Sequence, residues 1–318
     1  MGFDWVYLNP LHYPGFSGSL YAVKDYYQLN PLFRDQSGRD DATLLAEFTG
    51  TARDRGLKIM MDLVVNHTAK DSLLAEQHPD WFARERDGSI RSPFAVDPAD
   101  TRKKTVWGDL GEIDYDNAAI LPALADYWAG VVRHHIQRGF VGFRCDAAYK
   151  VPADVWRRII ADARRMDSNV RFFAETLGCR LEQIEKLADA GFDYLFNSVK
   201  WWDFEAPWAL EQYEMFRHIA PSIAFPESHD TERLANELPA DLPRPDDIRK
   251  WLVLRYALAA CFSTGVLMPV GYEYGFRRRL DVVRTRPADW EKPQFDLSRE
   301  IAAINRMKAA CPALNEEG

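Results

Sequence analysis

The sequence predicts an α/β protein of the (β/α)8-barrel class, on three observations. Strand-like and helix-like segments alternate along the 318 residues, as a parallel sheet requires. The longer strand-like segments are apolar on both faces, which is typical of parallel strands covered by helices. Four of the segments also end in charged side chains, which would meet at one end of a parallel barrel.

Seven strands are expected from short apolar runs bounded by turn residues. In chain order they are Phe3–Leu8, Leu57–Val65, Val141–Cys145, Arg171–Ala174, Tyr194–Asn197, Ser222–Phe225 and Val266–Pro269. A closed barrel of this class has eight strands, so we expect the first strand and its helix to lie upstream of Met1. An open, doubly wound sheet is the alternative fold.

Six helices are expected from apolar residues at helical spacing. They are Asp41–Arg55, Ile120–Arg138, Ala153–Met166, Leu181–Ala190, Ile248–Phe262 and Ser298–Lys308. Gly56 and Gly139 follow the first two and end them. A long loop is expected between Asn9-Pro10 and the first helix.

The stretch from Thr68 to Asn117 is polar and has no sustained period. A stretch of this length in a compact domain is functional or forms a small subdomain. We therefore expect a short inserted domain at 68–117, after the third barrel strand, with 1–67 and 118–318 forming the catalytic barrel.

Composition excludes several classes of partner. The formal net charge is -8 and no Lys/Arg run is present, which argues against nucleic acid. No apolar run is long enough to span a membrane. The four cysteines are scattered without a CxxC pair, so we expect free, buried thiols and a cytoplasmic location. The sequence carries no signal for an oligomeric state.

Four segments carry the candidate chemistry: DLVVNH (62–67), GFRCDAAYK (142–150), FFAETLG (172–178) and AFPESHD (224–230). Arg144 and Asp146 are two apart on a strand and share a face, so the guanidinium favours the ionised carboxylate, which suits a nucleophile. Glu175 follows an apolar run, where its carboxyl would be partly desolvated. Desolvation would raise the pKa of Glu175, which suits a general acid. Asp230 adds a third carboxylate. Structural ion pairs are the alternative interpretation.

At these residues the chain resembles the α-amylase superfamily, glycoside hydrolase family thirteen, whose four signature regions match the four segments in order. The resemblance implies that Asp146 is the nucleophile, Glu175 the general acid/base and Asp230 the carboxylate that stabilises the transition state. It also implies six substrate-binding residues. They are Tyr21 (stacking under a sugar ring), Asp62 (supporting the arginine), His67 and His229 (contacting sugar hydroxyls), Arg144 (holding the nucleophile) and Lys150 (on the leaving-group side).

The resemblance implies a retaining enzyme that cleaves or transfers α-1,4-linked glucose chains through a covalent glycosyl-enzyme. Its substrate would be an α-glucan or a maltooligosaccharide. One alternative is a maltosyltransferase that uses maltose 1-phosphate, or another α-glucanotransferase. GYEYG (271–275) favours that neighbourhood, whereas CDAAYK (145–150) is more similar to the amylases. A remote alternative is a non-catalytic carbohydrate-binding barrel.

No cofactor is expected to be required, and no metal ligand is assigned. The calcium-binding amylases of the family carry a histidine just after the second region, where this chain has Val151 and Pro152 after Lys150. Asn66 keeps another ligand position, so a calcium site is left open. The adjacent His134 and His135 lie mid-helix with no carboxylate pattern nearby, and we interpret them as structural.

Overall fold

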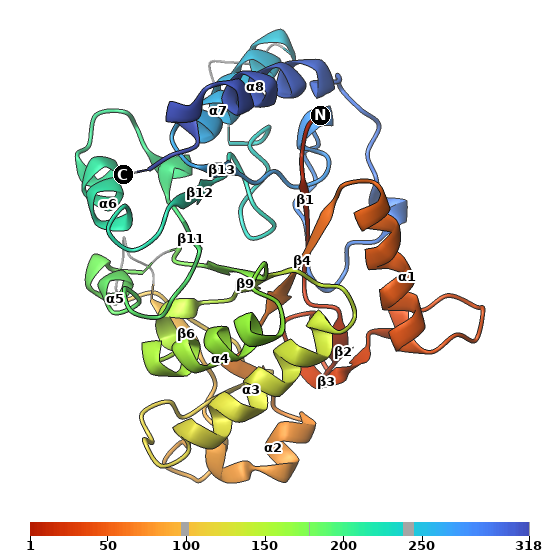
Figure 1. Cartoon of the computed structure of the whole chain (residues 1–318), viewed down its shortest axis with the longest axis vertical. Coiled ribbons are helices and arrows are strands. Elements are labelled where there is room, and N and C mark those ends of the chain that lie inside the picture. The colour runs from red at the N-terminus through yellow and green to blue at the C-terminus, as the bar shows by residue number, and fades with distance from the viewer. Residues whose placement is uncertain (97–101, 178, 238–244, 318) are drawn as a thin grey trace. The chain divides into compact units, whose positions relative to one another are not determined.

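The computed structural model describes residues 1–96, 102–177, 179–237 and 245–317. The chain divides into two compact units. The N-terminal unit comprises Asp4–Asp193, and the C-terminal unit comprises Met1–Phe3 together with Tyr194–Gly318. Figure 1 shows that both are built from parallel strands joined by helices.

Four parallel strands form the centre of the N-terminal unit. In spatial order they are β1 (Trp5–Leu8), β4 (Lys58–Leu63), β9 (Gly142–Cys145) and β10 (Arg171–Ala174). β9 is buried along its whole length, as expected for a parallel strand covered on both faces. A Cβ on Gly142 would lie 2.6 Å from the Trp5 ring, so the close approach of this ring to β9 requires glycine there.

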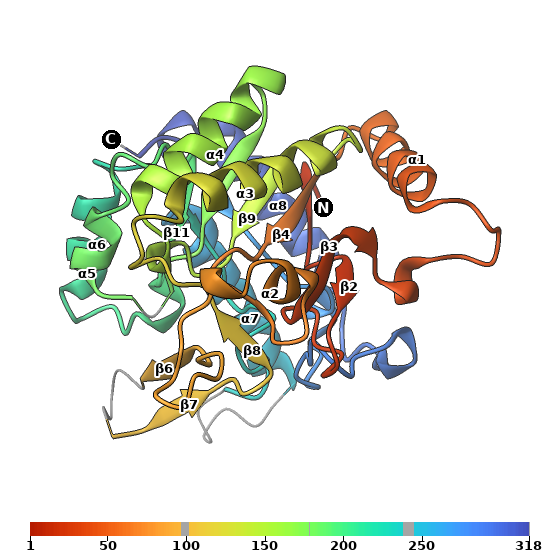
Figure 2. The same cartoon turned by 90° about the horizontal axis from the view of Figure 1, so that it is seen from below.

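Helices cover these strands. They are α1 (Asp41–Asp54), α3 (Leu121–Ile136), α4 (Ala153–Met166) and the short α5 (Leu181–Glu185). The Asp40 carboxylate caps α1 by accepting from the Thr43 N–H. α4 buries Trp156 and Ile159 on its apolar stripe, and Figures 1 and 2 show it beside α3. α5 ends at Glu185 rather than Ala190, because the next residues form i→i+3 turns, such as Leu187 N–H to Ile184 C=O.

One expectation of irregular structure was wrong. The expected loop before α1 contains an antiparallel pair, β2 (His12–Pro14) and β3 (Val23–Leu29). In β3 the buried residues are Val23, Tyr26 and Leu29, so the burial pattern has no two-residue period to recognise.

The stretch 68–117, which was expected to form a short inserted domain, contains regular structure. Its elements are β5 (His67–Ala69) paired with β8 (Leu110–Glu112), the helix α2 (Leu73–Gln77), and the hairpin of β6 (Phe94–Val96) and β7 (Lys104–Val106). Each strand has three residues, too few to show a period. Figure 2 shows β6 and β7 at the bottom, and α3 and α4 at the top. The domain boundaries at 67/68 and 117/118 stay a prediction.

The C-terminal unit has three parallel strands. They are β11 (Tyr194–Phe196), β12 (Ser222–Ala224) and β13 (Gly265–Val266), in this order. Its longer helices are α6 (Trp208–Phe216), α7 (Pro245–Cys261) and α8 (Ser298–Ala310). With four strands in one unit and three in the other, the expected seven parallel strands are all found in the described residues. The last strand was expected at 266–269, and α6 was not expected.

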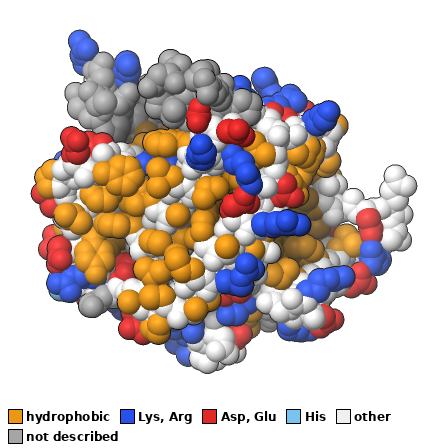
Figure 3. Space-filling view, turned by 90° about the horizontal axis from the view of Figure 1, so that it is seen from above, with side chains coloured by type: hydrophobic (Ala, Val, Ile, Leu, Met, Phe, Trp, Pro, Cys, Tyr) orange, Lys and Arg blue, Asp and Glu red, His pale blue; other side chains and the backbone are white. Residues whose placement is uncertain are grey.

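The core of this unit lies between α7 and α8, where Leu252, Tyr256 and Ile301 are buried and Phe3 packs against them. Figure 3 shows hydrophobic side chains on the face that carries these helices, and Leu254 and Met307 are 52% and 48% exposed.

Two sequence expectations concern the whole chain. No helix among the described residues is long and apolar enough to cross a membrane. The four cysteines are free, as expected, but only Cys145 is buried and Cys261 is exposed.

Candidate active site

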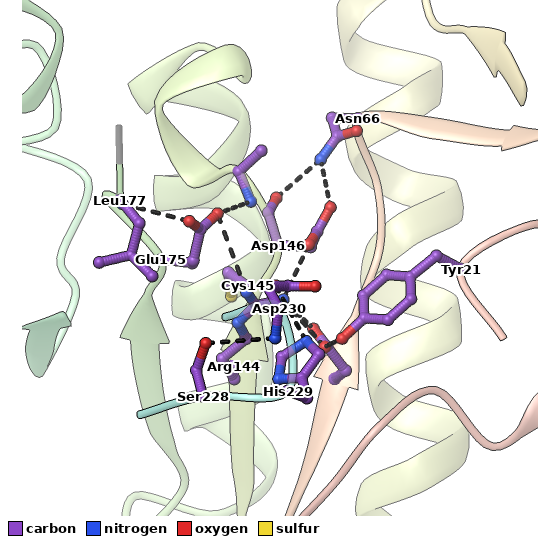
Figure 4. A network of polar contacts seen from close by, with 12 residues as sticks. Tyr21, Asn66, Arg144, Cys145, Asp146, Glu175, Leu177, Ser228, His229 and Asp230 are labelled. Atoms are coloured by element: carbon purple, nitrogen blue, oxygen red, sulfur yellow. Dashed lines mark hydrogen bonds and ion pairs between the residues drawn. The ribbon is translucent and has the colours of Figure 1, made fainter. Parts of the chain in front are cut away.

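Adjacent strands place an acidic and a basic side chain side by side in the N-terminal unit. The register of β4 with β9 pairs Asp62 with Arg144. One guanidinium nitrogen of Arg144, Nη1, lies 2.9 Å from Asp62 Oδ2 and 2.8 Å from Asp146 Oδ1. The Arg144 side chain is 5% exposed, so these contacts are screened little by water. Figure 4 shows this group from close by.

Asp62 holds the arginine within the buried part of the site. It is fully buried, and its Oδ2 accepts hydrogen bonds from the Tyr7 hydroxyl at 2.5 Å and the Tyr21 hydroxyl at 2.6 Å. Burial raises the pKa of Asp62, while Arg144 and the two hydroxyls act in the opposite direction. The structure thus places Tyr21 at the site through its hydroxyl, and the expected stacking of its ring under a sugar stays a prediction.

Asp146 is held at both oxygens. Arg144 contacts Oδ1, and the Asn66 amide donates to Oδ2 at 3.0 Å and to the Asp146 carbonyl at 2.8 Å. The side chain remains 15% exposed, so it is fixed in direction yet accessible. This is the placement that a carboxylate nucleophile requires.

His67 lies directly beside this group. It is buried, and its Nδ1 contacts the Asn66 side-chain oxygen. Burial lowers the pKa of His67, which keeps the ring neutral at pH 7. Asn66 therefore orients both Asp146 and His67, a role that the sequence did not predict.

Glu175 follows β10 and faces the same guanidinium. Its Oε2 lies 3.9 Å from Arg144 Nη2 and accepts from the Ala147 N–H at 2.7 Å, while Oε1 accepts from the Leu177 N–H at 3.2 Å. Ala147 has a φ of 40°, a left-handed conformation rare for alanine. The side chain is 12% exposed, so the partial desolvation expected from the FFA run is found. The expected difference in acidity between Glu175 and Asp146 stays a prediction.

Lys150 points toward the inserted segment. Its Nζ lies 3.5 Å from the Phe94 carbonyl oxygen and 5.8 Å from the centre of the Trp107 ring. Trp107 is 40% exposed beside the β6–β7 hairpin. The sequence did not single out Trp107, since only the fold brings it next to the second signature segment.

The remaining two predicted residues belong to the C-terminal unit, in the loop after β12. His229 Nε2 lies 3.1 Å from Asp230 Oδ2, and the Asp230 side chain is 62% exposed. The Asp230 N–H donates to the Ser228 hydroxyl at 3.2 Å, and these three residues are labelled in Figure 4. Their assembly with the residues of the N-terminal unit stays a prediction.

The described residues contain no group of three or more His, Cys, Asp and Glu side chains arranged to hold a metal ion. Asn66, the one residue kept from the calcium-site pattern, has its amide nitrogen on Asp146 and its oxygen on His67. Of the His134–His135 pair, His135 is buried and its Nε2 lies 3.0 Å from His12 Nε2, and the structural role expected for the pair stays a prediction.

Comparisons with known proteins identify relatives across the whole chain. A family model described as the glucanotransferase domain of glycogen debranching enzyme matches residues 1–85. An alpha-1,4-glucan:maltose-1-phosphate maltosyltransferase of Burkholderia pseudomallei is 32% identical over 288 residues, which are 88% of this chain and 24% of the relative. One of the same description from Pseudomonas aeruginosa is 26% identical, over 99% of this chain and 49% of the relative. The chain thus spans half or less of the length of these relatives.

Solved structures share the fold. A noncanonic maltogenic alpha-amylase from Thermotoga neapolitana matches with a TM-score of 0.70 and 22% identity, over 99% of this chain and 70% of that one. An alpha-amylase from Geobacillus thermoleovorans, complexed with acarbose, matches with a TM-score of 0.73 and 18% identity, over 99% and 70%. The fold class expected from the sequence is therefore confirmed.

Proposed function

We propose that the chain is a member of the α-amylase superfamily, and from this premise that the protein cleaves or transfers α-1,4-linked glucose chains with retention of configuration. One observation carries the proposal. A single buried guanidinium, that of Arg144, lies within 4 Å of three carboxylates, Asp62, Asp146 and Glu175. Two of them, Asp146 and Glu175, directly follow adjacent parallel strands, so they lie at the same edge of the sheet.

In the proposed reaction, Glu175 gives a proton to the glycosidic oxygen as the bond from that oxygen to the anomeric carbon breaks. Asp146 forms a bond to the anomeric carbon, and the shortened chain leaves with the proton. Glu175, now a carboxylate, takes a proton from the acceptor hydroxyl, whose oxygen displaces Asp146. Asp230 stabilises the oxocarbenium-like charge in both steps.

The contacts of Asp146 support its role as the nucleophile. Arg144 and Asn66 each occupy one carboxylate oxygen, which limits rotation of the side chain before substrate binds. Asp62 contacts the same nitrogen of Arg144 as Asp146 does and balances its charge, so the guanidinium stays in place. Neutral His67 supplies a ring for a sugar hydroxyl next to Asp146.

The acceptor decides which member of the superfamily this is. Water would make the protein a hydrolase, and a second sugar would make it a transferase. The names of the two maltosyltransferase relatives favour maltose 1-phosphate as a donor, with an α-glucan as acceptor. We keep this as the second candidate, because it uses the same three carboxylates.

The test incubates the full-length protein with maltoheptaose, with and without maltose 1-phosphate. Shorter sugars alone indicate hydrolysis, longer sugars indicate disproportionation, and phosphate release indicates the phosphorylated donor. Asp146→Asn should abolish all three activities, and an unchanged rate in that variant would contradict the proposal. A thermal shift with acarbose but no turnover would instead support a non-catalytic carbohydrate-binding barrel.

We further propose that the reaction needs no metal ion and takes place in the cytoplasm. The hydrogen bonds of Asn66 support the first point, because its amide is already committed to Asp146 and His67. Free cysteines support the second, since a reducing compartment maintains thiols.

A further inference from the structure

A buried ion pair closes the loop that carries Asp230. Glu227 and Arg233 stand on either side of His229 and Asp230, and they are 1% and 2% exposed. Arg233 Nη1 lies 2.7 Å from Glu227 Oε1, and the other oxygen of Glu227 accepts from the Leu234 N–H at 2.6 Å. The side chain of Glu227 therefore ties the start of the loop to its end.

The same arginine reaches a second segment. Arg233 Nη2 donates to the Val270 carbonyl at 3.0 Å, and its Nε donates to the Arg278 carbonyl at 3.1 Å. Both acceptors follow β13 in the chain. The planar guanidinium thus makes three directed contacts, one to Glu227 in the loop after β12 and two to the segment after β13, which a lysine ammonium could not reproduce in this geometry.

The backbone of Asp230 is held between these two segments. Its N–H donates to the Ser228 hydroxyl at 3.2 Å, and its carbonyl accepts from Arg279 Nη2 at 3.0 Å. Arg279 directly follows Arg278, whose carbonyl binds Arg233. The position of the Asp230 backbone is therefore linked to the Glu227–Arg233 pair at two points.

Stability alone does not account for this pair. Burial raises the pKa of Glu227, and Arg233 acts in the opposite direction. Burial therefore disfavours the ionised carboxylate of Glu227, whereas Arg233 favours it. Apolar residues of similar volume often replace a buried ion pair without loss of stability. The charged pair adds directed contacts, because its other hydrogen bonds hold the Leu234 N–H and the Val270 and Arg278 carbonyls.

We propose that Arg233, held by Glu227, is a positioning residue for Asp230. The inference rests on the proposed function, in which Asp230 stabilises the transition state. A shift of about 1 Å at such a carboxylate costs on the order of 100-fold in rate. Arg233 acts through the loop and has no contact with substrate in this mechanism.

The test compares the parent with Glu227→Leu/Arg233→Met, which exchanges the ion pair for apolar side chains. We expect near-parental thermal stability, a fall in kcat of about 10- to 100-fold and a KM for maltoheptaose within about twofold. The inhibition constant of acarbose should rise as well. A merely structural role would lower the fraction of active protein, which leaves that constant unchanged.

Two further variants keep the test decisive. Arg233→Lys retains the positive charge but not the planar guanidinium, and should keep only part of the parental kcat. If the double variant does not fold, Glu227→Gln is the fallback, because it preserves the side-chain volume. The glutamine has one acceptor oxygen fewer and leaves the Leu234 N–H without its acceptor, so kcat should still fall. The control is Arg249→Met, which breaks an exposed pair with Glu300 in the same unit and should leave kcat unchanged.

The two hypotheses fail in different ways. Activity retained in Asp146→Asn would overturn the proposed function, whatever Arg233 does. An inactive Asp146→Asn together with a folded double variant of parental kcat and acarbose inhibition would overturn the positioning role alone. Parental kcat in Glu227→Gln would overturn that role as well.

Discussion

Acidification should weaken the N-terminal unit through the buried pair of His12 and His135. His12 lies on β2 and His135 on α3, with 1% and 4% exposure, and their Nε2 atoms are 3.0 Å apart. One ring donates and the other accepts, so a proton added to the accepting nitrogen would set two donors against each other. Burial lowers the pKa of His12 from 6.5 to about 3, and that of His135 well below 6.5.

The sign follows from which state binds protons. Because the folded pKa lies below the unfolded pKa, the unfolded chain takes up protons first as the pH falls below 6.5. The contribution of His12 is therefore fully present at neutral pH and is lost between about pH 6.5 and pH 3. Each pH unit in this window costs about 1.4 kcal/mol per histidine, so His12 alone removes about 2 kcal/mol at pH 5.

The assay is urea unfolding of the parent and of His12→Phe at pH 7 and pH 5, followed by tryptophan fluorescence. The variant should be less stable at pH 7, because it leaves His135 without its partner. It should lose about 2 kcal/mol less than the parent on acidification. His218→Phe, at an exposed position, is the control and should behave as the parent does. An equal loss in the parent and in His12→Phe would refute the reasoning.

Three other predictions concern the site. Asp62→Asn should lower the free energy of unfolding by about 3 kcal/mol, because it removes one carboxylate partner of buried Arg144. Urea unfolding measures this change, and a loss under about 1 kcal/mol would contradict the prediction. Trp107→Ala should raise KM for maltoheptaose about fivefold and leave kcat nearly unchanged, since the exposed Trp107 ring can stack on glucose. Steady-state kinetics measure both constants, and an unchanged KM would exclude that contact. Chelation with EDTA should leave the thermal midpoint and the activity unaltered, and a marked drop restored by calcium would contradict the metal-free proposal.

Much of the site was predictable because its signals are local. Arg144 and Asp146 share a strand face by their spacing, and the polar ends of the strands follow directly from the sequence. The roles of Tyr7 and Asn66 were not predictable, because each depends on a partner far away in the chain: Tyr7 bonds Asp62 and Asn66 bonds Asp146. A hydroxyl or an amide carries no sequence signal of its partner.

The sequence by itself determined the class of fold, since hydrophobic runs and helical spacing are properties of consecutive residues. It also determined which side chains stand at the ends of the strands. Only the tertiary structure decided what else holds them: Asn66 bound to Asp146, the Ala147 N–H bound to Glu175, and Arg233 bound to Glu227. The physical reason is that hydrogen bonds and ion pairs join residues by distance and direction in space, and these are fixed only when the strands and loops pack.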